Sequence, residues 1–146
     1  MSRVSAILFV TPLFASACGL PDNPPVTQEI QWVDAETEAL ARRACYDCHS
    51  NETHWKGSHR WPIVNSLVRS DVKRARCVMN LSEWDGPNEE AWEASDALID
   101  GEMPLGLYKS SHPDARLTDD EIVRLAEGFE ATFAIDPPLP GERCDD

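Results

Sequence analysis

Apolar residues recur along the chain with a period of three to four, which is typical of amphipathic helices. The clearest helix follows Thr118, which forms a capping box with Glu121 at the helix start. Its apolar face consists of Ile122, Leu125, Ala126, Phe129 and Phe133. The proline-rich segment after this helix cannot continue it, so we expect a C-terminal tail over residues 135–146.

The first predicted helix begins at Asp34, a favourable N-cap that is followed by Glu36 and Glu38 in the first turn. Its apolar face consists of Leu40, Ala41, Ala44, Cys45 and Cys48. This places both cysteines at the C-terminal end of one amphipathic helix. The small residues Ala41, Ala44 and Ala126 would let the first helix and the helix after Thr118 cross closely.

Two more helices are predicted between these. One has Pro62 in its first turn, with an apolar stripe of Ile63, Leu67, Val68 and Val72 and with Arg69, Lys73, Arg74 and Arg76 facing outward. The other runs from about Asn88 to Ile99, buries Trp92 and Leu98, and ends at Asp100-Gly101. A loop follows. The pattern therefore predicts an all-α domain of about four helices over residues 33–134.

The net charge of the chain is −13, which excludes most nucleic-acid binders because phosphate binding needs a basic surface. An acidic surface favours solubility and electrostatic steering toward a basic partner. A solvated acidic face without a partner explains the same composition equally well.

The N-terminal residues 1–17 have the pattern of a signal peptide: Arg3, an apolar run from Val4 to Phe14, and small residues before Cys18. The run is too short to span a membrane. Ala15-Ser16-Ala17 suits an ordinary cleavage site, whereas the same residues followed by Cys18 resemble a bacterial lipobox. We favour acylation of Cys18, with residues 18–32 as a lipidated, proline-containing flexible tether. The protein would then be a periplasmic, membrane-anchored lipoprotein of a Gram-negative bacterium.

The segment CYDCHSNETHW carries the strongest chemical signal. Cys45, Cys48 and His49 lie three and four positions apart, so a helix presents them on one face. Cys-x-x-Cys-His is the attachment signature of c-type haem, in which two thiols bind the vinyl groups and the histidine binds the iron. We therefore expect one covalent haem c per chain.

Two other chemistries remain open for this motif. A zinc site would need further ligands, and His54 and His59 are near enough in sequence to complete one. A redox-active dithiol would need a thioredoxin-like strand–helix junction, and the pattern predicts no such strands. Haem is the best match of the three.

The second axial ligand of the iron has four candidates: Met103, His112, His54 and His59. Met103 precedes Pro104, which favours an extended backbone, and a methionine thioether raises the reduction potential as an electron carrier requires. Met103 is the preferred ligand and His112 the runner-up, although Met103 could instead fill the core. We expect His54 and His59 to be solvent-exposed, and Trp55, Trp61 and Trp84 are candidates for packing on the macrocycle.

The chain has five cysteines, an odd count for an exported protein. With Cys18 assigned to lipid and two cysteines to the motif, Cys77 and Cys144 remain. We expect them to form a disulfide that holds the C-terminal tail to the domain.

The order of CYDCHSNETHW, VRSDV, MNLSEWDG, GEMP and HPDARLTDDE resembles the bacterial haem-binding domain family of small, exported, c-type cytochrome-like proteins. The resemblance covers about Val33 to Phe133. It implies covalent haem on Cys45 and Cys48 with His49 as axial ligand, and it marks Met103 and the His112 segment as characteristic positions. Leu105, where the family often has a second proline, and Lys56-Gly57-Ser58 depart from the pattern.

These observations predict an exported c-type cytochrome that transfers electrons to or from a redox partner protein with a basic docking surface, and that carries a membrane anchor but no nucleic-acid site. A haem enzyme or sensor, peroxidase-like or gas-binding with a displaceable sixth ligand, is the alternative. A structural or chaperone-like protein without haem is a third possibility. An electron carrier is favoured over an enzyme because no distal acid–base residue is evident.

Overall fold

The computed structural model describes residues 20–144. Its six α-helices are α1 (Ala35–Ala44), α2 (Tyr46–His49), α3 (Pro62–Val78), α4 (Ala94–Ile99), α5 (Gly106–Ser111) and α6 (Asp119–Ile135). Three short 3-10 helices are η1 (Gly57–Arg60), η2 (Glu89–Glu93) and η3 (Pro113–Ala115). Residues 20–144 contain no β-strand, only two isolated bridges, so the all-α prediction is confirmed. None of the helices in this range is long and apolar enough to cross a membrane.

Three helix ends form as their sequences predict. The Asp34 carboxylate accepts a hydrogen bond from the Thr37 amide and caps α1. Thr118 and Glu121 form the capping box of α6, and Gly101 follows α4 with φ of 74°, a left-handed conformation that glycine adopts without strain. The helix predicted from Asn88 is split, because its first turn is η2 and only Ala94–Ile99 is α-helical.

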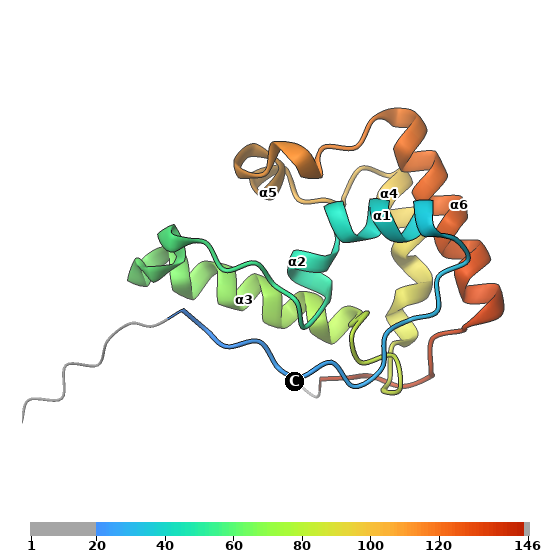
Figure 1. Cartoon of the computed structure of the whole chain (residues 1–146), viewed down its shortest axis with the longest axis horizontal. Helices are drawn as coiled ribbons and strands as arrows, with labels where there is room; N and C mark the ends of the chain where they lie inside the picture. The colour runs from blue at the N-terminus through green and yellow to red at the C-terminus, as the bar shows by residue number, and fades with distance from the viewer. Residues whose placement is uncertain (1–19, 145–146) are drawn as a thin grey trace, which may run out of the picture.

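The core lies where α4 and α6 run alongside each other with α1 across them (Figure 1). Phe129 and Phe133 of α6 pack against each other, and the Trp84 ring stacks on that of Phe133. The close approach of α1 and α6 occurs at Thr37 and Gly128, a contact that the sequence pattern did not indicate.

The expected apolar stripe of α3 is wrong over its first turns. Ile63 and Leu67 are 85% and 50% exposed, and of the four stripe residues only Val72 is buried. Arg76, expected to face outward, is turned inward and donates to the Ser50 carbonyl and the Thr53 hydroxyl. The first turns of α3 extend past the body of the domain (Figure 1), so helical periodicity there reflects an exposed face. Trp92, expected to be buried, is 54% exposed.

The N-terminal segment is part of the domain from Asn23 onward, which corrects the flexible tether expected over residues 18–32. Ile30 is 4% exposed and belongs to the core. The amides of Thr27 and Ile30 donate to the Ser82 and Leu81 carbonyls. These bonds fix an extended segment that has no periodic pattern of its own. The predicted signal peptide over residues 1–17 and the predicted acylation site Cys18 lie outside the described residues.

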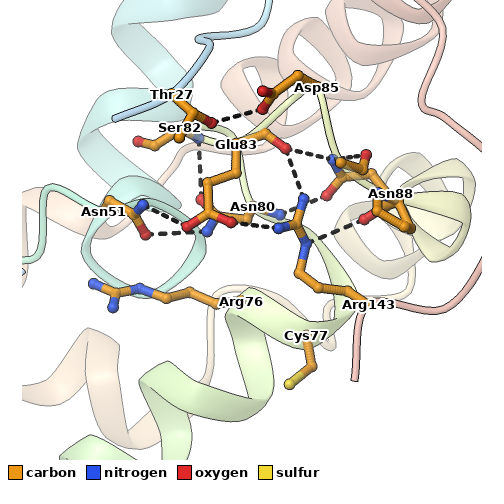
Figure 2. Close-up of polar contacts among 12 residues, drawn as sticks. Thr27, Asn51, Arg76, Cys77, Asn80, Ser82, Glu83, Asp85, Asn88 and Arg143 are labelled. Carbon is orange, nitrogen blue, oxygen red and sulfur yellow. Dashed lines mark hydrogen bonds and ion pairs between the residues drawn. The ribbon is translucent and has the colours of Figure 1, made fainter. Parts of the chain in front are cut away.

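A network of polar side chains joins the segment before α1 and the tail after α6 to the segment after α3 (Figure 2). The Glu83 carboxylate accepts hydrogen bonds from Asn51 and from Arg143, at 2.7 Å and 2.6 Å. Arg143 also donates to the Glu83 carbonyl at 2.6 Å. Cys77 and Cys144 form a disulfide with their Cα atoms 5.3 Å apart. The tail after α6 is thereby held against the C-terminal end of α3.

The contact between Gly128 and Thr37 generates a first prediction. A Cβ at position 128 would lie 2.5 Å from the Thr37 hydroxyl oxygen, and overpacking of this kind costs about 1–3 kcal/mol. We expect Gly128→Ala to lower the free energy of unfolding, measured by urea titration, despite the higher helix propensity of alanine.

The matched control is Gly106→Ala, because a Cβ on this helical glycine would meet nothing within 4 Å. That substitution should be neutral or slightly stabilising. Equal stability of both variants would show that α1 and α6 are not packed closely at position 128.

Candidate functional site

The Cys-x-x-Cys-His motif occupies one helical turn that begins at a break in the chain. The predicted single helix ends at Ala44, and Cys45 has φ of −117° at the junction with α2. The amides of Cys48 and His49 both donate to the Cys45 carbonyl, at 3.1 Å and 2.9 Å. The motif therefore stays on a helical turn, although this turn is separate from α1.

His49 is held in place through its ring and its backbone. Its Nδ1 lies 3.2 Å from the Met79 carbonyl oxygen, which can only accept, so Nδ1 carries the proton. Its carbonyl accepts from the Leu81 amide at 2.8 Å. Burial lowers the pKa of His49, which favours the neutral imidazole. The free lone pair is then on Nε2, the arrangement that a metal-binding histidine needs.

The two cysteines of the motif are partly buried and are not bonded to each other. Burial raises the pKa of Cys45 to about 12. Burial, followed by the negative charge of Asp47, raises the pKa of Cys48 to about 11. Both side chains are therefore thiols near neutral pH, whereas a catalytic dithiol lowers the pKa of its attacking cysteine.

A cleft of about 480 Å³ opens beside these residues, within the usual range for small-molecule sites. Cys45, Cys48 and His49 line it from one segment, and Met79 lines it from the end of α3. Five alanines contribute to its walls: Ala44, Ala75, Ala91, Ala94 and Ala97. Small side chains from several elements leave room for a large, flat, apolar group.

Met103 also lines this cleft, on the segment between α4 and α5. Its amide donates to the Ala97 carbonyl at 3.0 Å, and its side chain is 37% exposed. The structure therefore brings Met103 to the same cleft as His49 and leaves it out of the packed core.

His112, the runner-up ligand, is not among the residues that line the cleft. Its ring stacks on Tyr108 with 4.0 Å between centroids, and its Nδ1 is 3.1 Å from the Tyr108 carbonyl. The Tyr108 hydroxyl donates to the Asp47 carboxylate at 2.9 Å. Tyr108 does line the cleft, so these contacts fasten α5 to the turn that carries the motif. Burial, followed by the charge of Asp47, raises the pKa of Tyr108.

The other expected residues lie away from the cleft. His54 is exposed as expected, whereas His59 is 8% exposed and its Nδ1 accepts from the Lys56 amide. Among residues 20–144 no three or more His, Cys, Asp or Glu side chains are close enough to hold a metal ion, so the zinc alternative has no site there. The tryptophans proposed to pack on a macrocycle, Trp55, Trp61 and Trp84, do not line the cleft.

The residues present fit a haem. Two neutral thiols and one imidazole with a fixed proton lie on one turn, beside an apolar cleft that also contains a thioether. Sequence reasoning missed Tyr108, Met79 and the alanines of η2 and α4. Nothing in the spacing of these residues points to a cleft, because they come from separate elements.

Comparison with known proteins gives one match. A family model described as a haem-binding domain matches residues 5–131. Neither the curated proteins nor the solved structures include a match to this chain.

The raised thiol pKa values generate a second prediction. In the haem-free protein at pH 8, alkylation by iodoacetamide should be slower than for a free cysteine by about a hundred-fold at Cys48 and about a thousand-fold at Cys45. Each unit by which the pKa is raised lowers the thiolate fraction about ten-fold. The rate should rise about ten-fold per pH unit until it approaches pH 11. Mass spectrometry of the alkylated peptides measures both rates.

Unfolding the same protein in urea is the control, since it removes the burial and should restore ordinary reactivity. Rapid alkylation of either cysteine in the folded protein at neutral pH would instead indicate an activated thiol of the dithiol type.

Proposed function

Since this chain belongs to the haem-binding domain family, we propose that it is an exported c-type cytochrome that carries one covalent haem and transfers electrons. The observation that supports this most is the convergence of Cys45, Cys48, His49 and Met103 on one apolar cleft. Two thiols favour covalent attachment, and an imidazole with a thioether is the ligand pair of many electron-transfer haems.

Each residue has a separate role in this proposal. The Cys45 and Cys48 thiols would form the thioether bonds to the haem, and His49 Nε2 and the Met103 sulfur would bind its iron. The haem supplies one-electron exchange when bound. The protein holds its position, limits access of water and sets the reduction potential through the ligands and their hydrogen bonds. The bond from His49 Nδ1 to the Met79 carbonyl fixes the ring and increases its basicity.

A haem enzyme or gas sensor is the second candidate function. The observation in its favour is the 37% exposure of Met103, since a thioether near solvent can leave the iron and open a site for a small molecule. Fast binding of carbon monoxide by the reduced protein, or rapid reaction with peroxide, would favour this candidate over the electron carrier.

Localisation and partners form part of the same proposal. The N-terminal sequence supports export and acylation at Cys18, which would keep the protein at a membrane surface facing the periplasm. Four acidic residues line the cleft: Asp71, Glu90, Glu93 and Glu102. A redox partner with a basic docking surface would be attracted to this side of the molecule.

Covalent attachment is the third prediction. After expression with a c-type haem maturation system, we expect one haem to remain bound through denaturation and organic extraction. The Cys45→Ala/Cys48→Ala variant should lose all covalent haem, as measured by the pyridine haemochrome spectrum and by intact mass.

The control is Val78→Ala, which alters the cleft lining without removing a thiol and should retain covalent haem. A wild-type protein that matures without any added mass would contradict the proposal.

The role of Met103 is the fourth prediction. Met103→Ala should abolish the weak sulfur-to-iron absorption band of the ferric protein. It should also lower the reduction potential by on the order of a tenth of a volt, because the thioether stabilises the ferrous state. Optical redox titration measures both changes.

Leu105→Ala is the matched control, since Leu105 lines the same cleft two residues away and lacks a ligand atom. If Met103→Ala left both the band and the potential unchanged, Met103 would not be a ligand of the iron.

A further inference from the structure

The basic residues of this acidic chain are concentrated around α3. Residues 56–76 contain six of the thirteen Lys and Arg residues but only one of the twenty-six Asp and Glu residues. On a chain of net charge −13 this is a local positive charge, and of the six bases only Arg74 lines the cleft.

The bases on the exposed side of α3 have no acidic partner within the domain. Among the ion pairs of the described residues, none involves Arg60, Arg69 or Lys73. All three residues are exposed. Their charges are therefore available to an anion outside the protein.

Large apolar side chains lie beside these bases, on a neighbouring stripe of α3 and at the residue before it. Trp61 is 71% exposed, Ile63 is 85% exposed and Leu67 is 50% exposed. Ile63 and Leu67 are four residues apart in α3, so they share one stripe of the helix surface, and Trp61 directly precedes the helix. Ile63 and Leu67 project from α3 and Trp61 from the residue before it, and none of the three lines the cleft.

We propose that this surface, formed by Arg60, Trp61, Ile63, Leu67, Arg69 and Lys73, docks the protein on a bilayer that contains anionic phospholipid. A helix with exposed aliphatic and tryptophan side chains and with flanking bases binds at the lipid interface, where the apolar groups enter the acyl boundary and the bases meet phosphate. Tryptophan is enriched at that boundary.

The position of the first described residues supports a lipid partner over an acidic protein. Pro21 and Asp22 line an open groove of about 970 Å³ together with Arg69 and Lys73, and the described chain begins next to α3 (Figure 1). Cys18 precedes the first described residue by two positions in the sequence, so an acylated Cys18 would hold this end of the domain at the same lipid surface. The proposed docking does not depend on that anchor, because the charges and apolar side chains of the surface are themselves expected to bind the bilayer.

The test uses the haem-loaded exported protein with Cys18→Ser, whose leader is shown by mass spectrometry to be removed, so that no acyl chain contributes. Co-sedimentation is measured with vesicles of phosphatidylethanolamine and phosphatidylglycerol in equal parts, and with vesicles of phosphatidylcholine alone. We expect binding to the anionic vesicles that weakens as salt is added, and little binding to the neutral vesicles.

Two pairs of variants locate the surface. Lys73→Glu should weaken vesicle binding about five-fold or more, whereas Lys109→Glu, a base on α5, should have a much smaller effect. Ile63→Ser should weaken it about ten-fold, whereas Leu107→Ser should not, although Leu107 is similarly exposed at 72%. Circular dichroism and the haem spectrum confirm that each variant is folded and loaded.

Three outcomes would overturn the proposal: no binding to anionic vesicles, equal binding to neutral ones, or equal losses in the test and control variants. Association of the protein with itself through Ile63, without vesicle binding, would also overturn it and assign the surface to a second copy. None of these results bears on haem attachment, which is measured separately.

Discussion

The structure of the site depends on how the turn after Cys45 is held by the segment after α3. His49 is engaged twice, by its ring nitrogen with the Met79 carbonyl and by its own carbonyl with the Leu81 amide. Asn80 adds a side-chain hydrogen bond to Asn51 at 3.0 Å. Because two neighbouring segments exchange several short bonds, the imidazole has a fixed proton and a fixed orientation, and its second nitrogen is left for a ligand.

The polar network around Glu83 extends this constraint to both ends of the chain (Figure 2). Asn80 and Asn88 are nearly fully buried, and such amides are tolerated only when their hydrogen bonds are satisfied. The backbone amide of Asn80 donates to the Asn88 side-chain oxygen at 2.8 Å, and Arg143 pairs with Glu83. The segments that position the site are therefore largely non-helical and are specified by side-chain hydrogen bonds.

This explains which parts of the molecule could be predicted from sequence. Caps act over three or four residues, so Asp34 and Thr118 predict helix starts correctly, and the spacing of the Cys-x-x-Cys-His motif survives the break at Cys45. By contrast, α5 has only six residues and no side-chain cap, so it leaves no periodic signal. The backbone hydrogen bonds of residues 27–30 reach partners more than fifty positions away, and local patterns contain no such information.

The cleft and the groove beside α3 differ in the charges that line them, which bears on how the proposed cytochrome would meet two partners. Four acidic residues and one base, Arg74, line the cleft, whereas the bases Arg69 and Lys73 line the groove beside α3. An anionic bilayer would attract the basic residues of α3 and repel the acidic residues of the cleft. A basic redox protein would be attracted to the acidic residues of the cleft and repelled by the basic residues of α3. Binding of the membrane and binding of such a partner would then use different surfaces.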